Sequence, residues 1–463
     1  MHTSPNDHKQ YRYLTLANEL RVLLVHDAEA PRSAAALSVE IGHFDDPTDR
    51  QGMAHSLEQM RVLGTEKYPR VGECQTWSNR NGGSNKAWTG TENTTFFFEI
   101  SPHAFEEGLD RFGQFFTAPL FNEDAVDKER QAVDSEYKLK IKDDVRRLYQ
   151  VQKETINQAH PFAKFSVGDL TTLDDRNGQS VRDDLLAFYH QHYSADVMGL
   201  VLLGPQSLDE LEHFTQTFFS EIPNATTKKL AIDVPFVTEN ECQKFIQIEP
   251  IKELRKLTLS FALPSVDAHY QIKPLSYIAH LLGNEGTGSL MAILKQRGLI
   301  NTLTAGGGVS GNNFREFTIG LNLTPKGQQH TDEIVQCVFA FITLIKQQGL
   351  NAWRYQEKKS VLEMAFRYQE KSRPLDTVSY LVMNLLHYNA EDIIYGDYMM
   401  EGYDQDLLEQ LLAYLSVSNM RLTLVAQGGH YDRVAAWYDT PYSVTPFTPQ
   451  QTETGTNVSL DDA

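Results

Sequence analysis

The chain is poor in cysteine and has no long apolar run. Its 463 residues include three cysteines, Cys74, Cys242 and Cys337, and this odd number without C-x-x-C spacing does not favour a disulfide framework. No apolar segment has the length needed to span a bilayer, and residues 1–10 lack the charged and then apolar pattern of a secretory signal. These absences predict a soluble protein in a reducing compartment, with a cytoplasmic location.

Basic residues are also scarce. The chain carries 42 Lys and Arg against 61 Asp and Glu, a formal net charge of -19. Nucleic acids and anionic membranes bind basic surfaces, so this balance argues against both as partners. The length suits two or three domains, each large enough to bury a core.

An internal repeat divides the chain. Leu37-Ser38-Val39 recurs as Leu259-Ser260-Phe261, and Gly64 recurs as Gly286, in each case 222 positions later. A period of this length indicates a duplicated domain. Strands and helices alternate in each copy without a regular βαβ rhythm, which predicts an α+β fold.

The repeat also predicts the domain boundaries. We expect a first domain over residues 1–225, a linker over residues 226–235 and a second domain over residues 236–444. The segment 445–463 is rich in Thr, Gln, Pro and Asp, which predicts a disordered tail.

The strongest motif lies in the first copy. His55, Glu58 and Gln59 stand at i, i+3 and i+4, so on a helix their side chains project from one face. A His at position 59 would complete H-x-x-E-H, in which two imidazoles bind zinc and the Glu activates water. The equivalent positions of the second copy are Tyr277, His280 and Leu281, so only the first domain can hold the site.

A catalytic zinc site needs three protein ligands and an open position for water. Glu136 is the candidate for the third ligand, because it lies on a second predicted helix over residues 127–140. Glu129 lies on the same face of that helix, where it would orient a ligand.

These motifs resemble the insulinase or pitrilysin family (M16) of zinc metallopeptidases. The resemblance extends from about Tyr11 to Tyr442 and includes these blocks: Leu63-Gly64-Thr65-Glu66-Lys67-Tyr68-Pro69, Asn81-Gly82-Gly83-Ser84-Asn85, Ala132-Val133-Asp134-Ser135-Glu136, His160-Pro161-Phe162 and Gly283-Asn284-Glu285-Gly286-Thr287-Gly288. It implies two homologous α+β domains, each a mainly antiparallel sheet packed against helices, as in LuxS/M16-type metalloenzymes.

The resemblance also implies roles for individual residues. One zinc ion would be bound by His55, Gln59 and Glu136, with Glu58 as the base that takes a proton from water. Ser84, Asn85, Lys86 and Ala87 match the family's edge strand, which pairs with the substrate backbone. Ala305-Gly306-Gly307-Gly308 reads as a turn, in a region that resembles a site for peptide ends in larger family members.

Three residues depart from the family pattern. Gln59 replaces a zinc-binding His, and a neutral amide is a weaker zinc ligand than imidazole. Arg61 replaces an apolar residue, and Lys86 replaces an Asn. Together the departures predict weak or absent zinc binding.

The sequence therefore predicts a homologue of these peptidases with an impaired zinc site. We expect a weakly active or non-catalytic half that binds peptides, a second half of the same type, or a partner subunit. Two alternatives stay open at this stage: an active zinc endopeptidase, and a structural subunit like the protease-derived core proteins of respiratory complexes.

Overall fold

The computed structural model describes all residues except 177, 228, 230 and 453–463, and it divides into two compact units. Unit 1 comprises Met1–Leu139, Lys164–Leu230 and Ala365–Asp397, and unit 2 comprises Lys140–Ala163, Ala231–Met364 and Tyr398–Ala463. Each unit is a sheet packed against helices, which confirms the predicted α+β class.

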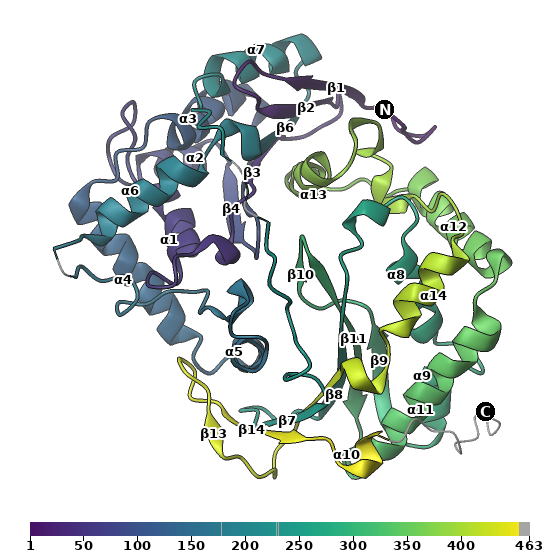
Figure 1. Cartoon of the computed structure of the whole chain (residues 1–463). Helices are drawn as coiled ribbons and strands as arrows, with labels where there is room; N and C mark the ends of the chain where they lie inside the picture. Colours follow the sequence, from purple (N-terminus) through teal and green to yellow (C-terminus); the bar gives the residue numbers. More distant parts are fainter. Residues whose placement is uncertain (177, 228, 230, 453–463) are drawn as a thin grey trace. The chain divides into compact units, whose positions relative to one another are not determined.

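Unit 1 contains a six-stranded sheet in the order β1-β2-β6-β3-β5-β4 (Figure 1). Its neighbouring strands pair in antiparallel fashion except for the parallel pair β2 and β6. The strands are β1 (Gln10–Thr15), β2 (Arg21–His26), β3 (Ser33–Val39), β4 (Ser84–Thr89), β5 (Thr94–Ile100) and β6 (Met198–Gly204).

Both faces of this sheet are covered. The larger core lies beneath the helices α1 (Met53–Gln59), α2 (Glu73–Arg80), α3 (Phe105–Thr117), α4 (Glu123–Leu139), α6 (Val181–His192) and α7 (Leu208–Phe219). Helix α13 (Pro374–His387) covers the opposite face and packs Leu381 and Leu385 against Val201. Burial on both faces explains why β3 and β6 are buried at every position and mostly apolar, with no alternation of apolar and polar residues.

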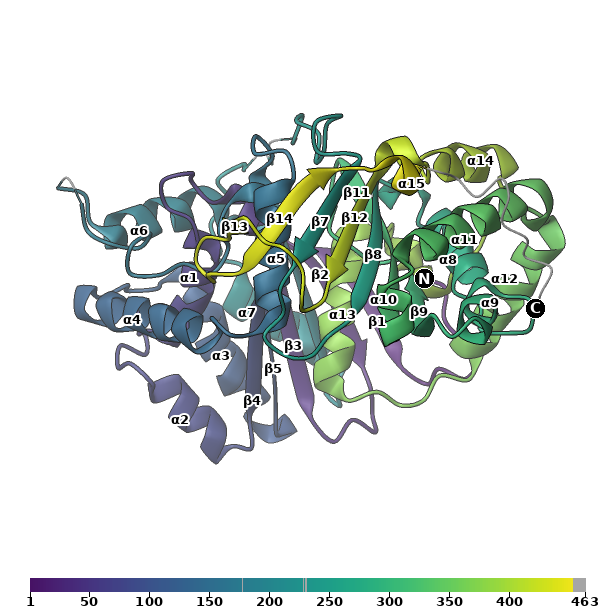
Figure 2. The same ribbon diagram turned by 90° about the horizontal axis from the view of Figure 1, so that it is seen from below.

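Unit 2 contains a second sheet in the order β10-β11-β8-β12-β7-β14-β13, with β9 paired to β11 (Figure 2). Its strands are β7 (Lys244–Ile248), β8 (Lys256–Leu263), β9 (Ile300–Ala305), β10 (Ser310–Gly311), β11 (Phe314–Leu323), β12 (Met420–Val425), β13 (Arg433–Val434) and β14 (Pro441–Pro446). Its helices are α5 (Asp144–Thr155), α8 (Pro274–Leu282), α9 (Leu290–Gln296), α10 (Pro325–Gln328), α11 (Thr331–Leu344), α12 (Ala352–Arg367), α14 (Gln405–Ala413) and α15 (Pro449–Thr452).

The repeat is visible in the strand order. The parallel pair β7 and β12 of unit 2 corresponds to β2 and β6 of unit 1, and β8 and β11 correspond to β3 and β5. The strand next to this parallel pair has a different origin in the two sheets, because β7 pairs with the C-terminal strand β14 where β2 pairs with the N-terminal strand β1.

Neither compact unit is a single continuous segment of the chain. Helix α5, from the first repeat, belongs to unit 2, where Val151 packs against Ile246 and Tyr442. Helix α13, from the second repeat, belongs to unit 1. The predicted domain boundaries therefore stay a prediction. They divide the chain by its sequence repeat, whereas the compact units group segments that lie together in space.

Parts of the predicted linker and tail lie outside the described residues, namely 228, 230 and 453–463. Strand β14 reaches Pro446, and α15 covers Pro449–Thr452, so ordered elements extend into the segment predicted as a tail. No helix of the described chain is both long and apolar enough to cross a membrane.

Candidate functional site

Helix α1 carries the predicted motif, and a buried carboxylate determines where it begins. Asp46 accepts hydrogen bonds from the backbone N–H groups of Gly52, at 2.9 Å, and Ala54, at 2.8 Å. Gly52 has a φ of 93°, and a Cβ there would lie 2.4 Å from the Cα of Gly168. Glycine is therefore required where α1 meets the segment that contains Val167.

Asp46 also makes the stability of the fold depend on pH. Burial raises the pKa of its carboxyl to about 7, although the hydrogen bonds from Ala54 and Gly52 lower it. The stabilising contribution of the protonated form is complete below about pH 4 and is lost as the pH rises through about 7, a change of up to about 4 kcal/mol. We expect the stability difference between wild type and Asp46→Asn to change over this range in urea unfolding. Parallel pH curves for the two proteins would contradict it.

His55 is held from both sides of its ring. Nδ1 lies 2.7 Å from the carbonyl oxygen of Val167, and Nε2 lies 3.5 Å from Oε2 of Glu136 on α4. Burial lowers the pKa of His55, but the hydrogen bond to Glu136 and the charges of Glu58 and Glu136 outweigh it, so this pKa is raised. An imidazole whose Nδ1 donates to a carbonyl directs Nε2 toward a carboxylate or a metal.

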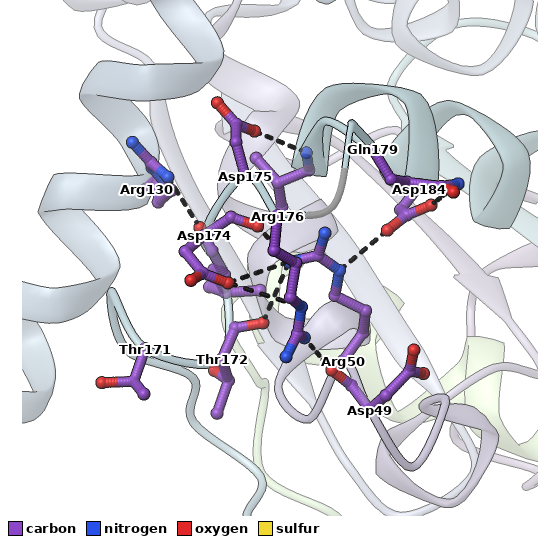
Figure 3. Close-up of polar contacts among 12 residues, drawn as sticks. Asp49, Arg50, Arg130, Thr171, Thr172, Asp174, Asp175, Arg176, Gln179 and Asp184 are labelled. Atoms are coloured by element: carbon purple, nitrogen blue, oxygen red, sulfur yellow. Dashed lines mark hydrogen bonds and ion pairs between the residues drawn. The ribbon is translucent and has the colours of Figure 1, made fainter.

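A polar network fixes the segment that follows Val167 (Figure 3). Arg50 is 3% exposed and donates from Nε to Asp184 at 2.8 Å, and it also forms an ion pair with Asp174. Arg130 of α4 donates to the carbonyl oxygen of Leu173 at 3.0 Å. These contacts connect the start of α1, α4 and α6 to the segment that orients His55.

Glu58 is buried, and both oxygens of its carboxylate have polar partners. Thr89 of the edge strand β4 donates to its Oε2 at 2.6 Å. Arg61 lies 3.5 Å from its Oε1 and donates to the Glu58 carbonyl oxygen at 3.2 Å. The guanidinium of Arg61 therefore places a positive charge beside the Glu58 carboxylate.

Gln59 completes the group that the sequence predicted. Its amide nitrogen lies 3.5 Å from Nε2 of His55 and 3.5 Å from Oε1 of Glu58. An amide nitrogen donates hydrogen bonds and does not bind a cation. The structure thus brings His55, Glu58, Gln59 and Glu136 together, while a donor group faces the ring nitrogen of His55.

This set of residues does not fit a catalytic zinc site, which needs three nitrogen, sulfur or carboxylate ligands. Within the described residues, no group of three or more His, Cys, Asp or Glu side chains is placed to hold a metal ion. His55 and Glu136 supply two donors, and the third position is an amide.

Glu129 lies near Arg61. Burial raises the pKa of its carboxyl, and the positive charge of Arg61 lowers it in part. Arg61 therefore interacts with two carboxylates of the site, Glu58 and Glu129. Sequence reasoning noted Arg61 as a departure but missed this pairing, although its i, i+3 spacing from Glu58 is the spacing of a helix ion pair.

The predicted substrate strand is an edge strand. In the described part of the chain, β4 pairs with β5 alone, so the backbone on its other side is open to an added strand. Asn85 and Lys86 are exposed, whereas Ser84 and Ala87 are partly buried. Helix α1 packs beside β4, which places the edge strand next to Glu58.

Unit 2 has a cavity of about 560 Å³ at the predicted glycine run. Gly306 and Gly307 line it, together with Glu285, Arg315 and Lys358. Both glycines have positive φ, 92° and 79°, which leaves the backbone exposed in this wall.

The fold and the site define a class: an α+β protein whose helix α1 has the spacing of an inverted zinc-peptidase motif, with the amide of Gln59 at the position of the motif's second His. Comparison with protein families agrees. Residues 21–159 match the family model described as insulinase (peptidase family M16), residues 180–362 match the peptidase M16 inactive domain, and residues 366–462 match the middle or third domain of peptidase M16. The chain belongs to the M16 insulinase family.

Individual relatives support this assignment. The chain is 36% identical to the A-factor-processing enzyme of Saccharomyces cerevisiae over 445 residues, which is 95% of this chain and 43% of that protein. It is 36% identical to the insulin-degrading enzyme of Homo sapiens over 444 residues, which is 95% of this chain and 44% of that protein. The crystal structure of pitrilysin superposes with a TM-score of 0.94 at 31% identity, and the match covers 97% of this chain and 48% of that one.

The chain spans less than half the length of these relatives. The first half of the periplasmic protease PqqL from Escherichia coli has the same fold, with a TM-score of 0.73 at 17% identity over 92% of this chain. The matched region is therefore comparable in extent to one half of a two-half protein.

Proposed function

We propose that this chain is a half of the M16 type with an impaired zinc site, which binds peptides or a second half and has little or no catalytic activity. The observation that carries the proposal is Gln59, whose amide nitrogen lies 3.5 Å from the ring nitrogen of His55. Where a zinc peptidase has its second imidazole, this site has a neutral amide, which is a weaker zinc ligand.

Arg61 supports the proposal independently. A metal ion normally balances the negative charge of a site built from carboxylates, and here Arg61 interacts with Glu58 and Glu129. The charge of the site is thus compensated without a metal.

Two surfaces are suited to peptides. The open edge of β4 offers backbone donors and acceptors to an extended chain, with Ser84, Asn85, Lys86 and Ala87 along it. The cavity of unit 2 offers the Gly306–Gly307 backbone with Glu285 and Arg315, which suit the charged end of a peptide. The chain spans less than half the length of the relatives, which supports a second half or a partner subunit as its other binding partner.

A cytoplasmic location is part of the proposal and rests on the three cysteines, all of which are free thiols. An active zinc endopeptidase and a structural core-type subunit are the alternatives, and each makes a different experimental prediction.

The test compares binding with turnover. A fluorescent peptide of about ten residues is titrated with the purified chain, and a quenched version of it is used to measure hydrolysis with zinc and with a chelator. We expect saturable binding, and no hydrolysis above that of a Glu58→Gln control. Hydrolysis that the chelator and Glu58→Gln both abolish would establish the active endopeptidase instead. Absent peptide binding with a stable complex to a second half would favour the structural subunit.

A further inference from the structure

Unit 1 contains a cavity beside the candidate site that no step above uses. It encloses about 110 Å³ between α2, α3 and the sheet. Its walls are mainly aromatic and aliphatic: Val62, Leu63, Trp77, Phe96, Phe98, Phe112 and Phe115. An apolar cavity of roughly 150 Å³ is known to bind benzene, so this one has room for about one branched aliphatic group.

The same cavity is lined by two arginines with unused donors. Arg111 lies between two aromatic rings, with its guanidinium carbon 4.4 Å from the centre of Tyr68 and 3.9 Å from that of Trp77. Its Nη1 donates to the carbonyl oxygen of Glu107 at 3.1 Å, and the carboxylate of Glu107 lies 3.8 Å away but is 70% exposed. Its Nε is buried without a hydrogen-bond partner among the described residues.

Arg61 has the same property. Its Nη1 contacts Glu58, whereas its Nε is buried and has no partner in the described chain. A buried donor without an acceptor is costly, and because both arginines line the cavity, an acceptor bound there would reach two guanidinium groups that the described chain leaves incompletely paired.

We propose that this cavity binds a small branched aliphatic carboxylate, with the alkyl group among the aromatic side chains and the carboxylate accepting from Arg111 and Arg61. A carboxylate is the acceptor that a guanidinium pairs with most strongly, and it also carries the negative charge that the arginines attract. The same chemistry occurs in a free branched-chain acid and at the C-terminus of a peptide that ends in a residue such as leucine.

The cavity borders the surface at β4, where its lining residues Asn85 and Lys86 are exposed. Gln75 of α2 and Asn85 of β4 both line it, and they are joined by a hydrogen bond of 2.6 Å. Lys86 is exposed beside them and adds a third positive charge. This site does not depend on zinc, because Gln59, His55 and Glu136 are not part of its lining, although it shares Arg61, Asn85 and Lys86 with the proposed peptide-binding half.

Cys74 provides a built-in reporter. It lines the cavity and is partly exposed, whereas Cys242 and Cys337 are buried. Burial raises the pKa of its thiol, so alkylation is slow and is readily followed at constant pH and ionic strength.

The experiment measures alkylation of Cys74 in the full chain by N-ethylmaleimide, using mass spectrometry. The probes are 4-methylpentanoate, its amide, a tripeptide ending in leucine and the C-terminal amide of that tripeptide. At about 20 mM we expect the free acid, the free-carboxylate tripeptide or both to slow alkylation about fivefold, and neither amide to slow it. A fivefold effect corresponds to a millimolar dissociation constant, which is reasonable for a ligand of this size. The probe that protects Cys74 from alkylation shows whether the carboxylate belongs to a free acid or to a peptide C-terminus.

Equal protection by an acid and its amide, or no protection by any probe, would overturn the proposal. Arg111→Met keeps the apolar volume but removes one of the positive charges, and it should reduce the difference between acid and amide. Arg80→Met on the exposed side of α2 is the matched control and should keep it. Direct calorimetric titration of the wild-type chain with the same four probes gives the answer even where a variant fails to fold.

Discussion

Zinc affinity should rise by at least about 10- to 100-fold when Gln59→His is introduced, because an imidazole replaces an amide as the third ligand. His55 and Glu136 are already placed for this, with 3.5 Å between their nearest nitrogen and oxygen atoms. The Nδ1 of His55 is occupied by Val167, so its Nε2 is the atom left for the metal. Competition with a chromophoric chelator gives the affinity, and elemental analysis gives the stoichiometry.

A second substitution should add to the first. Arg61 keeps a positive charge next to Glu58 and Glu129, and this charge opposes a divalent cation in the same cluster. We therefore expect Gln59→His with Arg61→Leu to bind zinc more tightly than Gln59→His alone. Arg61→Leu alone is the control, and it should not bring zinc to the site because the third ligand is still absent.

The result would go against this account if the wild-type chain held one zinc ion as tightly as Gln59→His does. Gln59 would then act as a ligand through its amide oxygen, and the impaired-site proposal would fail. Adding Glu136→Gln to the Gln59→His variant checks that the metal occupies the intended site, because it removes a carboxylate ligand and should lower the affinity again.

The fold could be predicted well from the sequence, because its signals are local or repeated. The apolar runs of β3 and β6 and the 222-residue repeat point to two similar sheets, and the structure has two. The assignment of α5 and α13 to compact units could not be predicted. Each helix is an ordinary amphipathic segment, and which sheet it covers depends on packing between residues distant in the chain.

The candidate site was also predictable only in part. The helical spacing of His55, Glu58 and Gln59 places them on one face, and the structure brings Glu136 to them. The partners that hold these side chains were missed, among them Val167 and Thr89. A backbone carbonyl leaves no trace in the residue type, and a threonine in a strand is ordinary, so neither role could be recognised before the fold was known.

Arg50→Met should be among the most destabilising single changes in unit 1. Arg50 is 3% exposed, donates to Asp184 at 2.8 Å, lies 3.5 Å from the carboxylate of Asp174 and also donates to the Asp174 and Thr172 carbonyl oxygens. Methionine preserves much of the apolar stem but removes the guanidinium that these acceptors share (Figure 3). Because Asp184 and Asp174 are partly exposed to water, we expect a loss of about 3 kcal/mol, the lower end for a broken buried pair.

The loss should have a local signature. The segment that Arg50 holds continues from Val167, whose carbonyl oxygen orients His55, so its amides should exchange faster than those of β3 and β6. Hydrogen exchange by mass spectrometry resolves both regions in one experiment. Arg176→Met is the matched control: Arg176 also pairs with Asp174, but it is 38% exposed, so its removal should cost less than about 1 kcal/mol. Equal effects of the two substitutions would mean that Arg50 contributes only a surface charge, and that other contacts hold Val167 against His55.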